Sequence, residues 1–228
     1  MKRLFLLPLL LTIIPVIAGE STDRSLMGSD TVVWTGVDYS LAQFIGPNDK
    51  TVPYNFIVPD ALPDMYAQWN QLFLDERLDQ VGRSLNKRVL IDLDGVTKDN
   101  QSVDAKKQIH LLPHVGRELD FPGIKRRDID KEVASYKLKN QKGLGLVLIV
   151  DKLVRKYSVS RSSSLKPGAI DVTANGGAVY VVFFDLDTRR VISCERQVYD
   201  VTIGANFRNF WFGPIKDAGR SLAGYRPQ

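Results

Sequence analysis

Hydrophobic residues recur along this chain at two spacings, one typical of strands and one typical of helices. Short runs of β-branched, aliphatic and aromatic residues predict strands at Thr31–Tyr39, Val89–Leu93, Leu144–Tyr157, Ala178–Phe184 and Val191–Tyr199. Apolar residues at three- and four-residue steps predict helices over 60–85, from Asp128 onward, and over 207–222 with an interruption at Gly213-Pro214.

The order of these elements predicts one domain of the α/β (α+β) class over residues 31–228. Strands alternate with helices at first, and a hairpin turning at Asp185–Arg190 then leads to a closing helix. We therefore expect a single mixed or antiparallel sheet with helices on one face, which is a two-layer sandwich. The polar residues 19–30 predict a flexible N-terminal segment, and residues 97–127 predict a long connection.

The first residues have the pattern of an export signal. Lys2 and Arg3 precede the uncharged apolar run Leu4–Ile17, and the run ends in Ala18, a small residue suited to signal-peptidase cleavage. As a helix this run would span about 21 Å, which is short of the roughly 30 Å of a hydrocarbon core. We expect residues 1–18 to be a signal peptide, leaving an exported, periplasmic or extracellular chain that does not span the membrane after cleavage.

The composition is that of an ordinary globular protein, but its charge is unevenly distributed. The chain has 228 residues, 44% hydrophobic and 25% charged, which excludes collagen-like, coiled-coil and wholly disordered chains. Residues 20–120 carry 10 basic and 16 acidic residues, whereas residues 121–228 carry 19 basic and 10 acidic ones. Basic clusters such as Lys125-Arg126-Arg127 and Arg189-Arg190 would suit anionic envelope polymers. Alternatively, the two oppositely charged halves face each other within one fold.

One segment resembles the first motif of haloacid-dehalogenase-type phosphatases. An apolar strand pattern ends in Asp92-Leu93-Asp94-Gly95-Val96. The resemblance implies that Asp92 attacks phosphorus and Asp94 acts as acid and base beside a magnesium ion. That family also needs a strand–helix alternation and a later acidic motif, whereas the residues after 144 predict a meander. Asp185-Leu186-Asp187 ends another strand pattern at a hairpin, so turn formation is the alternative for both pairs.

Two histidines and one cysteine are the remaining candidates for chemistry. His110 and His114 have a spacing that could place two zinc ligands on one helical face, but Pro113 interrupts such a helix. Loop histidines are the alternative. Cys194 is the single cysteine of the chain, so an internal disulfide is excluded. The strand pattern of the residues around it favours a small buried side chain over a nucleophile or a dimer-forming thiol. We expect no cofactor.

The last part of the chain resembles α/β modules of the bacterial envelope. The resemblance rests on Leu144–Val150, Val179–Phe184, the turn Asp187-Thr188-Arg189, Val191–Ile192 and an amphipathic helix from Asn209. This pattern, over about 80 residues, is similar to the amino-terminal domain of TolB and to curli-secretion and related outer-membrane lipoproteins. It is also similar to exported bacterial proteins with no assigned activity. The resemblance implies a non-catalytic envelope module and carries over no functional residue.

Together these patterns predict an exported, soluble binding or scaffolding module of the bacterial envelope. Its partner would be an envelope protein or an anionic envelope polymer; the export signal and the absence of a recognition-helix pattern argue against nucleic acid. The alternative is a secreted magnesium-dependent phosphatase-like hydrolase that uses Asp92 and Asp94. The hydrolase hypothesis predicts that these carboxylates meet a third acidic group in a pocket. The binding-module hypothesis predicts that they lie at a solvated turn.

Overall fold

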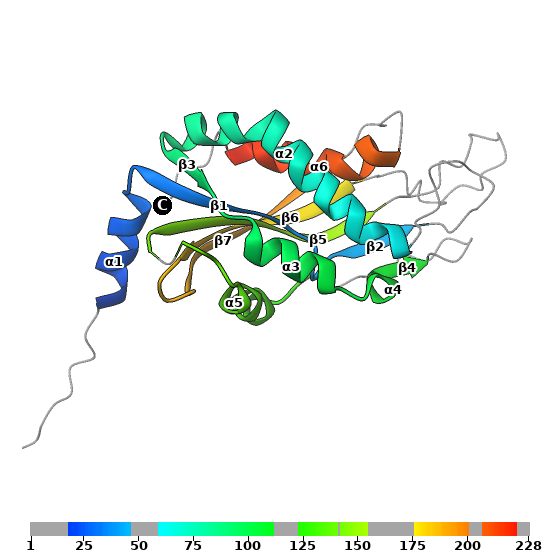
Figure 1. Cartoon of the computed structure of the whole chain (residues 1–228), viewed down its shortest axis with the longest axis horizontal. Coiled ribbons are helices and arrows are strands. Elements are labelled where there is room, and N and C mark those ends of the chain that lie inside the picture. Colours follow the sequence, from blue (N-terminus) through cyan, green and yellow to red (C-terminus); the bar gives the residue numbers. More distant parts are fainter. Residues whose placement is uncertain are drawn as a thin grey trace, which may run out of the picture.

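The computed structural model describes residues 18–46, 59–111, 123–140, 142–154, 176–200 and 207–222 (Figure 1). Its elements, in chain order, are α1 (Ala18–Met27), β1 (Thr31–Asp38), β2 (Gln43–Gly46), the 3₁₀ turn η1 (Pro59–Ala61), α2 (Leu62–Leu85), β3 (Arg88–Ile91), α3 (Asp94–Ser102), α4 (Ala105–Gln108), β4 (Ile109–Leu111), α5 (Arg126–Ser135), β5 (Leu144–Val154), β6 (Gly176–Asp185), β7 (Val191–Asp200) and α6 (Phe207–Ser221).

The seven strands form one mixed sheet centred on β5. One edge of β5 pairs with β1 and then with β2, so these two strands lie end to end. Beyond them, β3 pairs with β1 and β4 pairs with β2, and all of these pairings are parallel. On its other edge β5 pairs with β6, and β6 with β7, in antiparallel register. Strands β3 and β7 therefore stand at opposite edges of the sheet.

Both faces of the sheet are buried, which adds a layer to the expected sandwich. Leu146 and Leu148 pack in a cluster with α2 and α6, whereas Val147 and Ile149 pack with Ile129 of α5. Figure 1 shows α2 and α6 on one side of the sheet and α3 and α5 on the other. The α/β class and the mixed sheet are confirmed. The helices cover two faces because β5 is apolar at successive positions, as in strands buried on both sides.

Several elements differ from the sequence-based expectation. The expected flexible segment 19–30 lies largely in α1, and the expected connection 97–127 contains most of α3, all of α4 and β4, and the start of α5. In α3 the residues Gly95, Val96 and Asn100 are buried, so its inner face is largely small or polar and has no apolar repeat. Helix α6 continues through Pro214, which lies so close to Gly177 that a Cβ there would be 2.7 Å from the proline ring.

Three buried amide side chains replace a strand along the outer edge of β1. The pairing of β1 with β3 ends at Trp34, after which a bulge at Gly36, with φ +118°, shifts the register. The peptide groups of Val37 and Tyr39 then face the gap between β3 and β4. The Val37 N–H donates to Asn70 Oδ1 at 2.7 Å, and the Tyr39 N–H donates to Asn100 Oδ1 at 2.7 Å. The Gln108 amide donates to the Tyr39 carbonyl.

Gly36→Ala is expected to destabilise the protein by about 2 kcal/mol or more, because it combines backbone strain with a clash. The new Cβ would lie 2.9 Å from Asn70 Oδ1 and 3.3 Å from both Leu93 and Val96. Gly143→Ala is the matched control, since Gly143 has φ +106° and a Cβ added there would meet no atom within 4 Å. Urea unfolding of both variants separates the two effects, and equal losses would contradict the clash.

Candidate functional site

The two carboxylates of the phosphatase-like motif are used in local contacts. Asp92 is only 4% exposed, and its Oδ2 accepts hydrogen bonds from the Asn140 backbone N, at 2.8 Å, and from Asn140 Nδ2, at 3.2 Å. Asp94 begins α3 at the surface and pairs with Lys139 at 2.8 Å, a contact that lowers the pKa of Asp94. Both contacts tie the start of α3 to the segment that follows α5.

No third ligand joins these two carboxylates in the described part of the chain. Across that part, no three acidic, histidine or cysteine side chains are grouped so that they could hold a metal ion. Asp92 and Asp94 therefore lie at a strand-to-helix junction whose contacts the fold itself uses. The role of each in phosphoryl transfer stays a prediction.

The histidine pair is only partly described. His110 lies in β4 and lines a hollow of about 490 Å³, bordered by the β1–β2 connection and by α4. Gln43 and Lys107 also line this hollow. His114 lies outside the described residues, so the zinc hypothesis stays a prediction.

Cys194 has the setting of a structural cysteine. It lies in β7, paired with Val182 of β6, and is half-buried beside the α5 cluster. Burial raises the pKa of its thiol, and the charge of Arg126 opposes this effect only in part. A thiol with a raised pKa holds less thiolate at neutral pH, which disfavours a nucleophilic role.

Sequence reasoning missed a buried acidic cluster where β1 ends. Asp38 is fully buried and accepts hydrogen bonds from the Tyr136 hydroxyl and from the Ser40 N–H, the latter at 2.7 Å. Asp99 of α3 and Glu132 of α5 face it from the two neighbouring helices. The one signal in the sequence was Asp38 at the end of an apolar strand, the same pattern as at Asp92.

Burial sets the protonation of this acidic cluster. It raises the pKa of Asp38, although the hydrogen bonds from Tyr136 and Ser40 oppose the effect. Burial, with the charge of Asp38 as the next cause, raises the pKa of Glu132 to about 7. The same two causes raise the pKa of Asp99, and Lys137 opposes them. Glu132 therefore exchanges its proton near neutral pH, and the pKa values of Asp38 and Asp99 are shifted in the same direction.

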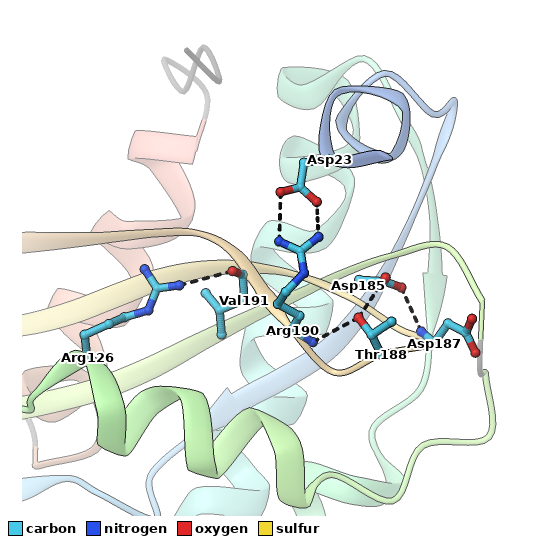
Figure 2. Close-up of polar contacts among 7 residues, drawn as sticks. All are labelled: Asp23, Arg126, Asp185, Asp187, Thr188, Arg190 and Val191. Carbon is cyan, nitrogen blue, oxygen red and sulfur yellow. Dashed lines mark hydrogen bonds and ion pairs between the residues drawn. The ribbon is translucent and has the colours of Figure 1, made fainter. Parts of the chain in front are cut away.

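The second Asp-Leu-Asp segment is a hairpin turn, as its sequence predicts. Figure 2 shows Asp185 accepting from the Asp187 N, at 2.9 Å, and from the Thr188 hydroxyl, at 2.8 Å. The Arg190 guanidinium points away from the turn and donates two hydrogen bonds to the Asp23 carboxylate on α1. These contacts lower the pKa of Asp23. The turn is thus closed by its own side chains and joined to the N-terminal helix.

Three residues of the basic clusters, Arg126, Arg127 and Arg190, pair with acidic residues. In the described part of the chain, three ion pairs join an acidic residue of the first half to a basic residue of the second: Asp94–Lys139, Asp23–Arg190 and Glu76–Lys216. Other basic residues pair within the second half, including Arg126–Asp130, Arg127–Asp128 and Arg196–Asp151. This pairing supports the interpretation that the two charged halves face each other in one fold.

Comparison with known proteins gives no family assignment: no protein-family model, no curated protein and no solved structure matches the chain. In the described residues, no helix has both the length and the apolar character needed to cross a bilayer. The envelope-module resemblance therefore stays a prediction.

Asp92→Asn is expected to lower the free energy of unfolding by about 1 to 2 kcal/mol, because it weakens a buried, charge-assisted contact with Asn140. Asp94→Asn, which breaks only an exposed ion pair, is the matched control, and its free energy of unfolding should be close to that of the unmodified protein. Chemical denaturation provides the comparison. The reverse order of stabilities would contradict this structural role for Asp92.

Glu132→Gln is expected to flatten the pH dependence of stability. Glu132 binds its proton more tightly in the folded chain, since its pKa rises from 4.5 to about 7. Its stabilising contribution is complete below the unfolded pKa and is lost as pH rises through the folded one. Asp38 and Asp99, whose pKa values are also raised, act in the same direction.

Urea unfolding between about pH 5 and pH 8 measures this effect, with exposed Glu195→Gln as control. The unmodified protein should lose stability over this range, and the Glu132 variant should lose less. Identical slopes for the two would mean that Glu132 does not titrate with the cluster.

Proposed function

We propose that this protein is an exported, non-catalytic protein-binding module of the bacterial envelope that contacts its partner along β7. The observation that carries this proposal is the exposure of an apolar residue on a long terminal strand. Val198 is 65% exposed, and β7 runs over ten residues at the edge of the sheet. Such edges pair with extended segments of other proteins, which supply backbone hydrogen bonds and side-chain contacts.

The charge distribution favours a protein partner over an anionic polymer. Arg126, Arg127 and Arg190 belong to the basic clusters, and each has an acidic partner within the chain. Arg196, the basic residue nearest Val198 on β7, is held by the buried Asp151 at 2.7 Å. A polyanion would have to compete with these carboxylates, whereas a paired strand would leave them in place.

Export is supported by the sequence of the first 18 residues. A short basic segment, an apolar run too short to span a bilayer and a small residue at position 18 form the pattern that signal peptidase cleaves. In the proposed mature protein the chain begins at Gly19, and Asp23 remains to bind Arg190.

A photoreactive residue placed at Val198 tests this proposal in cells. Illumination should give one discrete adduct in the envelope fraction, and the adduct should be lost when a lysine is placed at the neighbouring Gln197. The matched control carries the photoreactive residue at Gln68, an exposed position on α2, and should give no such adduct.

Three results would overturn the proposal. These are a cytosolic chain that retains Met1, the lack of an adduct at Val198, and a magnesium-dependent phosphatase activity that Asp92→Asn abolishes.

A further inference from the structure

Along the outer edge of β3, alternate peptide groups have no strand partner among the described residues. The Arg88 N donates to the Asp30 carbonyl, and the Asp92 N donates to the Trp34 carbonyl, both toward β1. Peptide groups alternate in direction along a strand. The N–H and C=O groups of Val89 and Ile91 therefore point away from β1, toward the edge where the strand order ends.

The same strand exposes apolar side chains on both faces of the sheet. Leu90 is 38% exposed and Ile91 is 52% exposed, and with Val198 they are the exposed large hydrophobic residues in the described part of the chain. Leu90 pairs with Val33 of the α5-side cluster, whereas Ile91 pairs with Trp34 of the α2-side cluster. A strand added at this edge would lie beside both side chains at once.

We propose that this edge binds a second copy of the same chain, with the two β3 strands antiparallel about a two-fold axis at Leu90. Val89 of each copy then faces Ile91 of the other, and these are the residues whose peptide groups point outward. Each such pair exchanges both of its N–H···O hydrogen bonds. The two Leu90 side chains meet on one face, and the contact is self-complementary, as a two-fold interface requires.

Charge complementarity favours a second copy in this register. Arg88, Leu90 and Asp92 alternate onto the same face of the strand, so Arg88 of each copy lies opposite Asp92 of the other. Asp92 Oδ2 is used by Asn140, whereas Oδ1 has no hydrogen-bond partner in the described part of one copy. Oδ1 is buried in one copy, so the exposed Arg88 guanidinium would lie at the sheet edge beside the Asp92 side chain, to which it is opposite in formal charge, and would not contact Oδ1 directly.

The opposite edge of the sheet is less suited to this contact. Strand β7 carries the charged residues Glu195 and Arg196 at consecutive exposed positions, and Val198 is its one exposed large hydrophobic residue in the described part of the chain, so it offers less apolar surface than β3 for contact between two copies. Strand β3 has four residues and no internal charge. Because so short a strand buries little area, we expect a weak dimer.

Cysteine crosslinking tests the register directly, in a Cys194→Ser background that removes the native thiol. In the proposed dimer the two Leu90 Cα atoms lie about 4.5 Å apart, within disulfide range. The two Ile91 Cα atoms lie on a diagonal of about 7–8 Å, beyond it. Mild oxidation of Leu90→Cys should therefore give a covalent dimer, and Ile91→Cys, although more exposed, should not. Equal crosslinking, or crosslinking at Ile91 alone, would overturn the proposal.

Sedimentation of the unmodified protein is an independent measurement, because it does not depend on whether a variant folds. Between about 1 μM and 1 mM the mean mass should rise from one copy to two and then level off. Leu90→Lys should shift this rise to at least tenfold higher concentration, and Val198→Lys should leave it unchanged. A chain that stays monomeric overturns the proposal. So does a mass that keeps rising beyond two copies, because that would indicate β3 pairing with β7 in an open assembly.

Discussion

The fold depends on three amide side chains that complete the hydrogen bonding of β1 where no strand covers its outer edge. Asn70, Asn100 and Gln108 come from three different helices and bind the N–H and C=O groups of Val37 and Tyr39. Buried peptide groups without partners cost about 1–3 kcal/mol each, so these side chains fix where α2, α3 and α4 pack. The bulge at Gly36 is the local change that turns these groups toward the amides.

This arrangement also determines which surfaces the sheet leaves open. Because amides take over from β3 after Trp34, β3 ends at Ile91 and the chain turns into α3 at Asp94. The edge strand is consequently short and apolar. The antiparallel hairpin leaves a second, longer edge at β7. A dimer through β3 would present two β7 edges, which would make the molecule a bivalent scaffold if the proposed function holds.

Strong apolar patterns and local turn signals gave reliable predictions, whereas polar interactions between distant parts of the chain could not be predicted. The helix of Tyr66, Trp69 and Phe73 was predictable because its aromatic residues repeat at three- and four-residue steps and pack on the sheet. The hairpin at Asp185 was predictable because its turn is closed by local side-chain hydrogen bonds. Helix α3 was missed because its inward face carries Asn100, whose role depends on a strand 61 residues away.

The candidate sites show the same division. Asp92 was identified from a local motif, but its partner Asn140 is 48 residues away and assigns it a structural contact. The cluster of Asp38, Asp99 and Glu132 joins a strand and two helices, and no local pattern connects these three residues. Three ion pairs, Asp94–Lys139, Asp23–Arg190 and Glu76–Lys216, join the oppositely charged halves of the chain across the fold.

The central claim is that buried polar side chains serve the fold while the sheet edges remain available for contact. Amide hydrogen exchange tests it most directly. Because the Val37 and Tyr39 N–H groups bind Asn70 and Asn100 inside the core, they should exchange as slowly as the central strand β5. In dilute protein the Val89 and Ile91 N–H groups should exchange much faster. Fast exchange at Val37 and Tyr39, or strong protection at Val89 and Ile91 in dilute protein, would contradict this account.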